Sequence, residues 1–212
     1  SSDRMIDLQL RVAPELWLKK LIIGGFDKVF EIGSSFRKEG IDGTHNPEFT
    51  TCEFYQSFIG LEDLMRTTES LFSDIFEELN KVEICHEQIQ WLRSEGSFKK
   101  IEFIPGIEEK TGTPLPEVLS QETLIGYFEQ IGLDTPSVKS IPQLLDSLSS
   151  TFLEPYCEGP TFIYHQPSIM APLAKSDDIK YEGGRSYNVS KRFELFIKGK
   201  EYVNAYEEEN SP

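Results

Sequence analysis

Arg37, Glu53 and Tyr55 bring a guanidinium, a carboxylate and a phenol into one stretch of the sequence, residues 28–58. An alternation with a period of two places these three on one face of two strands, with apolar side chains such as Phe30 and Ile32 on the other. We expect the apolar face to pack on a core. A row of polar side chains opposite it is unusual unless a ligand binds there, so this stretch predicts a binding surface.

A second group of reactive side chains lies near the end of the sequence, where four carboxylates crowd two predicted strands: Glu194, Glu201, Glu207 and Glu208. The strands are expected over residues 192–197 and 201–206, joined by a Lys198-Gly199 turn. Carboxylates in buried strands are costly unless they are paired or bind a metal, so the cluster predicts a cation. The alternative is that the four lie on a solvated face.

Strands and helices must position both groups. Residues 28–58 predict an antiparallel hairpin, because a loop rich in Gly, Asp, Asn and Pro joins the two alternating segments. A helix is expected before the hairpin, with Pro14 in its first turn and Gly24-Gly25 at its end. After the hairpin, apolar positions recur at helical spacing, and we expect this stripe to pack in the core: Leu61, Leu64, Met65, Thr68, Leu71, Phe72, Ile75, Phe76 and Leu79.

The remaining sequence carries weaker patterns. Short strands are expected over residues 7–12, 98–103 (ended by Pro105-Gly106) and 161–165. Helices are expected over residues 122–131, capped by Ser120, and 143–148. Residues 176–190, with Gly183-Gly184, predict a flexible loop. The helical, turn-rich character of residues 81–160 favours an insertion between parts of a sheet over a second catalytic unit.

Composition limits the classes of protein to consider. The 212 residues could form one large or two small domains, and a formal net charge of −15 argues against a surface that coats nucleic acid. Three widely spaced cysteines offer neither zinc spacing nor a disulfide scaffold, which indicates a reducing compartment. No apolar run approaches the length of a membrane span, and no signal peptide is visible.

The segment Phe36-Arg37-Lys38-Glu39, followed by a loop and a returning strand, resembles motif 2 of the class II aminoacyl-tRNA synthetases. Further segments resemble the lysyl-tRNA synthetases of that class, in the right order: Ala13-Pro14-Glu15-Leu16, Glu39-Gly40-Ile41-Asp42, His45-Asn46-Pro47-Glu48-Phe49-Thr50, Glu53-Phe54-Tyr55, Pro172-Leu173-Ala174-Lys175, Arg192-Phe193-Glu194-Leu195-Phe196 and Glu201-Tyr202-Val203-Asn204-Ala205-Tyr206. The resemblance covers about residues 5–80 and 161–212. It implies an α+β fold, an antiparallel sheet flanked by helices, with the active site on the polar face of the sheet.

The resemblance also implies an activity: L-lysine is activated with ATP to lysyl-adenylate and is then transferred to tRNA(Lys). Such a site needs positive charge at the phosphorus and good positioning, and no protein nucleophile. Arg37 would be the catalytic residue, contacting the α-phosphate and the lysine carboxylate. Further ATP contacts would come from Glu39, His45, Asn46 and Phe49, with Phe49 stacking on adenine. Glu194 and Glu201 would bind Mg²⁺ that bridges the phosphates.

The lysine pocket implied by the resemblance consists of seven residues: Glu15, Arg37, Glu53, Tyr55, Asn204, Tyr206 and Glu208. Glu53 and Glu208 would face the ε-ammonium, because burying a cation without a carboxylate is prohibitive. Plain alternation, however, puts Glu201 on the opposite face from the last three of these residues. If all serve one site, the strand needs a bulge or turn between Glu201 and Asn204.

The same resemblance places residues 1–212 within one class II catalytic domain, with residues 81–160 as a divergent insertion. An anticodon-binding β-barrel (OB) domain and motif 1 would precede this sequence and motif 3 would follow it, so the chain alone is expected to be inactive. The family implies a homodimer. Ser34-Ser35 and His165-Gln166 depart from the family pattern and favour an organellar member, which leaves the mitochondrial matrix or the cytoplasm as the compartment. His86 and His165 match no motif position and are expected to be structural or surface residues.

Several alternatives stay open. Without the family, Arg37 and Glu39 are most simply a local charge pair, and Tyr55 a half-buried strand aromatic. Within the fold, the rival is the paralogue that modifies translation elongation factor P, against which Ile41-Asp42 and the form of residues 13–16 argue. Aspartyl- and asparaginyl-tRNA synthetases would need a cationic side chain facing the substrate. A non-catalytic, lysine-binding regulatory paralogue should have lost Arg37, Glu194 or Glu201, and all three are present.

Overall fold

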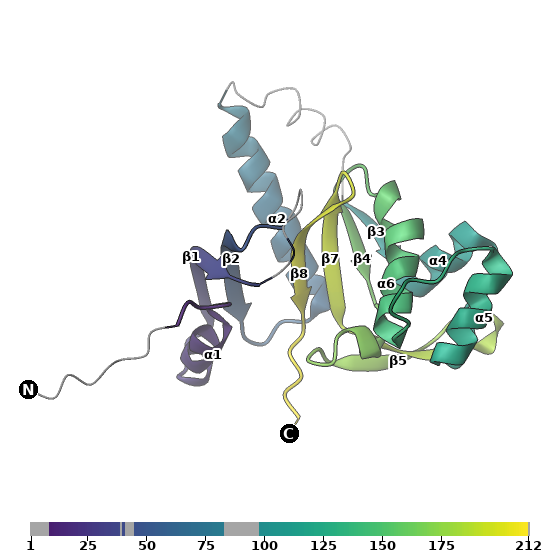
Figure 1. Ribbon diagram of the computed structural model, residues 1–212. Helices are drawn as coiled ribbons and strands as arrows, with labels where there is room; N and C mark the ends of the chain where they lie inside the picture. Colours follow the sequence, from purple (N-terminus) through teal and green to yellow (C-terminus); the bar gives the residue numbers. More distant parts are fainter. Residues whose placement is uncertain (1–8, 39, 41–44, 83–97, 212) are drawn as a thin grey trace, which may run out of the picture. The chain divides into compact units, whose positions relative to one another are not determined.

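The computed structural model of the protein describes residues 9–38, 40, 45–82 and 98–211, which fall into two units, residues 1–59 and 60–212. Helices and strands are labelled in Figure 1. Within the described ranges, no helix is long and apolar enough to cross a membrane.

The first unit consists of helix α1 (Glu15–Ile23) and a hairpin of strands β1 (Lys28–Phe36) and β2 (Glu48–Gln56). Pro14 precedes the helix, and the helix ends at Gly24, whose N–H bonds to the Lys20 carbonyl; Gly25 follows with a φ of 101°. Strand β1 pairs with β2 in antiparallel register. The predicted helix and hairpin are therefore confirmed.

The apolar face of this hairpin is more exposed than its polar face, which is the opposite of our expectation. Phe30 and Ile32, predicted to pack on a core, are 70% and 63% exposed, whereas Ser35 on the polar face is fully buried. Arg11 accounts for part of this cover: it forms an ion pair with Glu31 and donates through Nε to the Ser34 carbonyl. Gly33 leaves room for the guanidinium, because a Cβ at this position would clash with Arg11 Nη2. The prediction of a buried apolar face is thus wrong for the described residues.

The second unit is built on a four-stranded sheet with the order β3-β4-β7-β8. These strands span Lys99–Glu102, Thr161–Tyr164, Arg192–Ile197 and Lys200–Tyr206. Strand β3 runs parallel to β4, and the other two pairs are antiparallel. A separate hairpin pairs β5 (Ser176–Lys180) with β6 (Ser186–Ser190). Short 3₁₀ turns complete the unit: Glu154–Tyr156, Ser168–Met170 and Glu182–Gly184.

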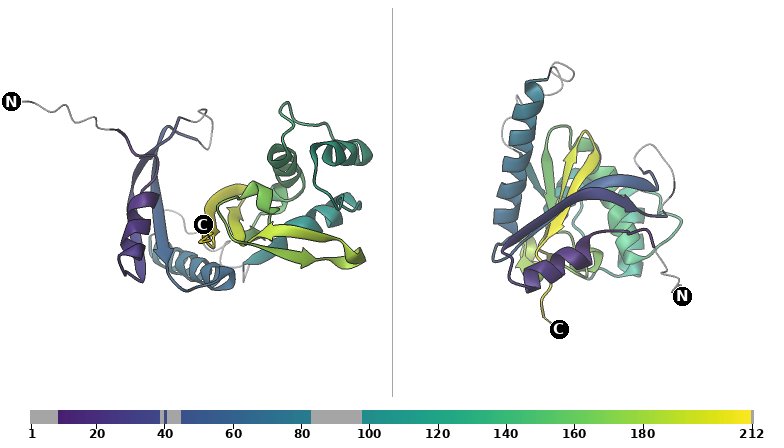
Figure 2. Two further views of the ribbon diagram at one scale, coloured as in Figure 1. Left: turned by 90° about the horizontal axis from the view of Figure 1, so that it is seen from below. Right: turned by 90° about the vertical axis from the view of Figure 1, so that its left-hand side faces the viewer.

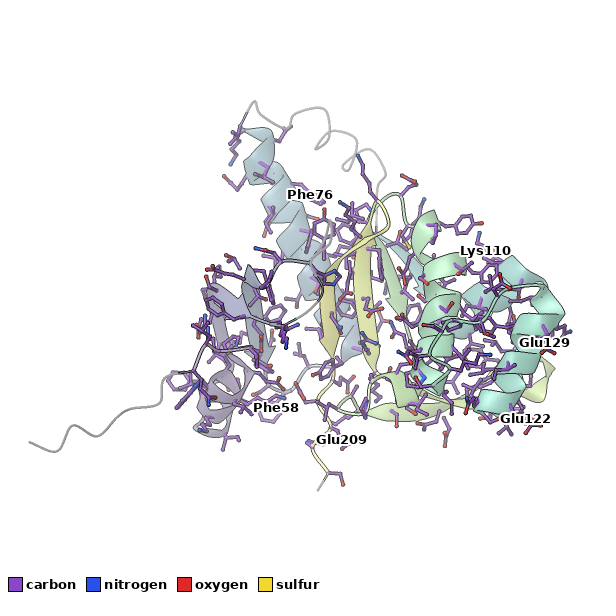
Figure 3. All side chains as sticks on the ribbon, viewed as in Figure 1. Phe58, Phe76, Lys110, Glu122, Glu129 and Glu209 are labelled. Carbon is purple, nitrogen blue, oxygen red and sulfur yellow. The ribbon has the colours of Figure 1, made fainter. Side chains whose placement is uncertain are left out.

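Helices cover both faces of the four-stranded sheet (Figure 2). Helix α2 (Leu61–Asn80) packs Leu61 and Met65 against Phe162, Phe193 and Leu195. Helices α4 (Phe103–Thr111), α5 (Gln121–Ile131) and α6 (Ile141–Phe152) form the larger core on the other face, which Ile163 and Phe196 of the sheet join. Figure 3 marks Phe76 of α2, which is buried with Ile197, and the exposed Glu122 and Glu129 of α5.

Most expected elements of the second unit are present, with three corrections to the chain as a whole. Residues 9–12, the described part of the strand expected over 7–12, form no strand. The strand over 98–103 is followed at once by α4, which contains Pro105 in its first turn, where an N–H has no intrahelical partner to lose. Residues 176–190 are the β5–β6 hairpin instead of a flexible loop. Tyr187 and Val189 alternate into the core and fix that hairpin.

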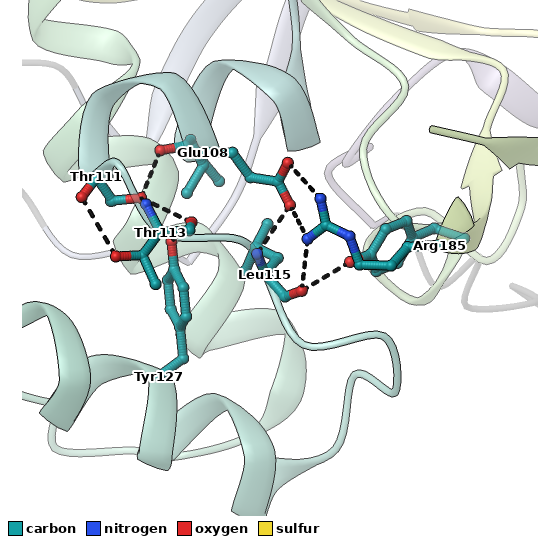
Figure 4. A network of polar contacts seen from close by, with 8 residues as sticks. Glu108, Thr111, Thr113, Leu115, Tyr127 and Arg185 are labelled. Atoms are coloured by element: carbon teal, nitrogen blue, oxygen red, sulfur yellow. Dashed lines mark hydrogen bonds and ion pairs between the residues drawn. The ribbon is translucent and has the colours of Figure 1, made fainter. Parts of the chain in front are cut away.

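A polar network ties the β5–β6 hairpin to the helical layer (Figure 4). Arg185 donates two hydrogen bonds to Glu108, Nη1 to Oε1 at 2.6 Å and Nη2 to Oε2 at 3.0 Å. The backbone of Leu115 joins them, because its N–H donates to Glu108 and its carbonyl accepts from Arg185 and Tyr187. The network therefore holds the β5–β6 hairpin against α4 and the segment that follows it.

Candidate active site

Arg37 follows the last residue of β1 and is held by the backbone of two segments, the hairpin loop and the residues that precede α1. Its N–H bonds to the Pro47 carbonyl at 2.9 Å, and its Nε bonds to the Val12 carbonyl at 3.2 Å. Its Cζ lies 5.2 Å from the centre of the Phe49 ring. An exposed guanidinium next to an aromatic face offers a charge and a stacking surface to one ligand.

Glu53 and Tyr55 lie two residues apart on the same face of β2, and the Tyr55 hydroxyl donates to Glu53 Oε1 at 2.7 Å. Both are half-buried. Lys19 of α1 lies above the Tyr55 ring, with Nζ 5.7 Å from its centre, and pairs with Glu15 at 2.5 Å. The ammonium of Lys19 therefore lies beside the face that carries Glu53 and Tyr55.

Three further predicted residues lie in or near the hairpin loop. Asn46 donates from Nδ2 to the Glu48 carbonyl at 2.7 Å, so its side chain supports the loop. His45 and Asn46 are exposed. Glu39 lies outside the described residues, and its predicted contact with ATP stays a prediction.

The second group of predicted residues lies on β7 and β8, and the register there is shifted by a bulge. Glu194 pairs with Asn204, whereas Phe196, two residues along β7, pairs with Glu201. The shift leaves Tyr202 as the extra residue on β8. Because paired residues share a face, Glu201 lies on the same face as Glu194 and Asn204. The strand thus has the bulge between Glu201 and Asn204 that a site shared by these residues would need.

Glu194 is largely buried on this face, with 16% of its side chain exposed. One carboxylate oxygen forms an ion pair with Arg192, and the other accepts a hydrogen bond from Gln166 Nε2 at 3.2 Å. Burial raises the pKa of Glu194 to about 7, the positive charge of Arg192 lowers it, and the negative charge of Glu201 raises it. The effect of burial on this pKa is therefore larger than the effect of the ion pair with Arg192.

Arg192 also donates from Nε to Asn204 Oδ1 at 2.9 Å, so one guanidinium links two residues predicted for different ligands. A pocket opens beside it, lined by Arg192, Glu194, Pro142, Gln143, Asp146 and Met170. The sequence patterns did not identify Gln166, Arg192 and Asp146 as residues around Glu194. Gln166 stands out in the sequence only as a departure from the family pattern, and Arg192 only as part of a segment that resembles the family.

Tyr206 and Glu208 lie where β8 leaves the sheet, and backbone bonds fix this segment. Glu208 forms a bridge with Ala174, and the backbone N–H and carbonyl of Glu207 bond to Lys191 and Lys175 at 2.9 and 2.8 Å. The side chain of Glu207 points to α2, where Oε1 accepts the Leu61 N–H at 2.7 Å. Tyr206 and Glu208 thus project from a segment anchored on both sides.

The two carboxylates of Glu194 and Glu201 suit a magnesium ion. They share a face, and the charge of one raises the pKa of the other, a repulsion that a divalent cation would relieve. Among the described residues, no three His, Cys, Asp or Glu side chains gather as a metal site of their own. Mg²⁺ commonly takes one or two carboxylates and completes its shell with water and phosphate oxygens. The donor set therefore fits the ion.

Comparison with known proteins gives a consistent result over the whole chain. The family model described as tRNA synthetases class II (D, K and N) matches residues 2–212. Two mitochondrial lysine--tRNA ligases, from Saccharomyces cerevisiae and Schizosaccharomyces pombe, are each 42% identical and cover 100% of this chain and 40% of the relative. A probable cytoplasmic lysine--tRNA ligase from Encephalitozoon cuniculi is 39% identical and covers 100% of the chain and 43% of the relative. The chain thus spans about two fifths of the length of these relatives.

Proposed function

Because the chain belongs to the class II tRNA synthetases of the D, K and N group, we propose that the protein is a lysine--tRNA ligase, which activates L-lysine with ATP and transfers it to tRNA(Lys). The observation that carries the proposal is the bulge in β8. The bulge puts Glu201 on the face of Glu194 and Asn204, where two carboxylates could bind one Mg²⁺, whereas plain alternation would put Glu201 on the opposite face from Asn204. The names of the similar ligases supply lysine as the substrate.

Arg37 would stabilise the reaction centre. In the activation step, a lysine carboxylate oxygen bonds to the α-phosphorus of ATP while the bond to the pyrophosphate oxygen breaks. Charge develops on the phosphate oxygens, and a planar guanidinium can donate to a phosphate and a carboxylate at once. Phe49, beside Arg37, would stack on the adenine, with Glu39, His45 and Asn46 as the further ATP contacts that we propose.

Lysine would be selected through its ε-ammonium. Glu53 with its Tyr55 hydrogen bond gives a half-buried carboxylate of fixed orientation, and Glu208 supplies a second one. The remaining lysine contacts that we propose are Glu15, Asn204 and Tyr206. The acidic character of these groups favours lysine over aspartate or asparagine, which would need a cationic partner.

Glu194 and Glu201 would hold Mg²⁺, which when bound neutralises charge on the ATP phosphates. An ion pair with Arg192 holds one oxygen of Glu194, and the bulge brings Glu201 to the same face. The presence of Arg37, Glu194 and Glu201 favours an enzyme over the non-catalytic paralogue. The partners that we propose are tRNA(Lys) and a second copy of the subunit. As the compartment we propose the mitochondrial matrix over the cytoplasm, because two of the relatives are named mitochondrial.

The test is ATP–pyrophosphate exchange by the full-length protein with each of the twenty amino acids. We expect exchange with lysine alone, reduced about 100-fold or more in Arg37→Ala, as for loss of a donor at a developing charge. Arg37→Lys keeps the charge but not the fork and should recover only part of the rate. Exchange with aspartate or asparagine would show that the protein activates another amino acid of the same synthetase group. Transfer of lysine to elongation factor P in place of tRNA would favour the paralogue that modifies this factor. No exchange with any amino acid would contradict the proposal.

A further inference from the structure

Gln166 is a buried polar residue in direct contact with Glu194. It is 1% exposed and follows β4 by two residues. Its amide nitrogen donates to Glu194 Oε2 and to the Ile163 carbonyl, each at 3.2 Å. Its amide oxygen is buried and accepts no hydrogen bond within the described part of the chain. The amide therefore uses its donors on both neighbours and leaves its acceptor without a partner.

This arrangement is costly for a residue whose only role is to fill the core. A buried acceptor without a partner lowers stability, and an apolar side chain of the same size would avoid the penalty. The two hydrogen bonds of Nε2 keep the amide in this orientation. Because Arg192 holds the other oxygen of Glu194, the carboxylate is fixed from two sides.

The backbone around Gln166 is fixed as firmly as its side chain. His165 has a φ of 58°, a left-handed conformation that a residue other than glycine adopts only when its surroundings impose it. Glu102 supplies this constraint, since Oε1 contacts His165 Nδ1 at 2.9 Å and accepts the Tyr181 hydroxyl at 2.8 Å. The Gln166 carbonyl accepts both the N–H and the hydroxyl of Ser190 at 2.8 Å. Contacts from β3 and β6 thus hold the backbone at residues 165–166, and the Gln166 side chain contacts Glu194 of β7.

We propose that Gln166 is a positioning residue that sets the orientation of the Glu194 carboxylate for Mg²⁺ and ATP, an inference that rests on the function proposed above. It acts through Glu194 and touches no substrate atom. Its removal should weaken the use of Mg²⁺ and leave lysine recognition intact, because the described side-chain contacts of Gln166 are with Ile163 and Glu194 and not with the residues proposed for the ε-ammonium.

The first test compares Gln166→Met and Gln166→Asn with Ser190→Ala in the full-length protein. Methionine keeps the volume without donors, and asparagine keeps an amide that is too short to reach Glu194. Ser190→Ala removes a hydrogen bond to the same residue's backbone and serves as the structural control. The Mg²⁺ concentration for half-maximal pyrophosphate exchange should rise at least fivefold in both Gln166 variants, with KM for lysine within twofold of wild type. In Ser190→Ala the Mg²⁺ concentration for half-maximal exchange should stay within twofold of wild type. Equal shifts in all three variants would overturn the proposal.

A second measurement separates this inference from the proposed function. Crystal structures of the wild type and Gln166→Met should differ in the Glu194 side-chain torsion angles, with the carboxylate turned away from its wild-type plane. A Glu194 side chain that superimposes in the two structures would overturn the positioning role. Absence of amino-acid-dependent exchange in the wild type would instead contradict the proposed function, and the crystal structures would still decide the role of Gln166.

Discussion

The Tyr55 hydroxyl donates to Glu53 across 2.7 Å, two residues back on the same strand. This bond fixes one oxygen of a half-buried carboxylate on the face where we place the ε-ammonium of lysine. The relationship is unusual for neighbours on one strand face, because both side chains must lean along the strand to meet. Its value for function is that a carboxylate of fixed orientation loses little freedom when a cation arrives.

Tyr55→Phe should raise KM for lysine about 10-fold, since one hydrogen bond to a charged group stabilises by about 1.5 kcal/mol. KM for ATP should stay unchanged. Tyr164→Phe is the matched control, because Tyr164 is also partly buried but lies in the second unit. This substitution should leave both KM values unchanged. A rise in KM for ATP equal to that for lysine would contradict the assignment of Tyr55 to the lysine pocket.

Glu194 should make the stability of the protein depend on pH in an unusual sense. Its pKa is raised from 4.5 to about 7, so between these values the folded state holds a proton that the unfolded state has lost. Stability therefore falls as pH rises through this window. Glu194→Gln should match wild type near pH 4.5 and become more stable above pH 7, by at most about 3 kcal/mol.

Hydrogen exchange of the β7 amides, compared between wild type and Glu194→Gln at each pH, measures this difference because the intrinsic exchange rates cancel. Glu201→Gln removes a charge that raises the Glu194 pKa and should shift the window to lower pH. A stability difference that is constant from pH 5 to 8 would show that Glu194 does not titrate in this range.

The pair of Arg185 and Glu108 should contribute measurably to the stability of the helical layer. Both side chains are about four fifths buried, and two hydrogen bonds join them. Arg185→Ala should lower the opening free energy of α4 and β6 by about 2 kcal/mol in hydrogen exchange, because Glu108 loses its charged partner. Arg66→Ala, which breaks an exposed pair with Asp63, should change nothing measurable. Equal effects of the two substitutions would contradict the prediction.

Glu207 should stabilise the start of α2. Its carboxylate accepts the Leu61 N–H at the helix terminus, where a negative charge is also favoured by the helix dipole. Glu207→Ala should lower the protection of the first α2 amides by about 1 kcal/mol in hydrogen exchange. Glu209→Ala is the matched control, because the Glu209 side chain bonds only to its neighbours Asn210 and Ser211 in the described contacts. Protection lost equally in both variants would exclude a specific cap.

The parts of the fold that the sequence predicts well are those with a local cause. Ser120 caps α5 because its own hydroxyl accepts the Thr123 N–H, and Lys198-Gly199 closes the last hairpin with two residues of positive φ. The β5–β6 hairpin was missed because its strands hold few apolar residues besides Tyr187 and Val189. Arg185, which lies between the two strands of this hairpin, forms hydrogen bonds with Glu108, and the 77 residues that separate them in the sequence are too many for a local pattern to predict the contact.

The candidate site shows the same division. The bulge in β8 could be predicted, because the family resemblance assigns Glu201 and Asn204 to one site and plain alternation puts them on opposite faces. The covered face of the first hairpin could not, since it depends on Arg11, whose contact with Glu31 and Gly33 is set in three dimensions. Gln166 escaped for the same reason: its neighbour Glu194 comes from another strand.

The hydrogen bond from Leu61 to Glu207 joins residues 146 positions apart. During synthesis on the ribosome, α2 emerges long before the residue that caps it, and β7 and β8 emerge after every helix of the second unit that the structure describes. Until then one face of α2 and one edge of β4 lack their partners. We expect this unit to complete its folding only after residue 207 has left the ribosomal tunnel, and the nascent chain to depend on chaperones in that interval.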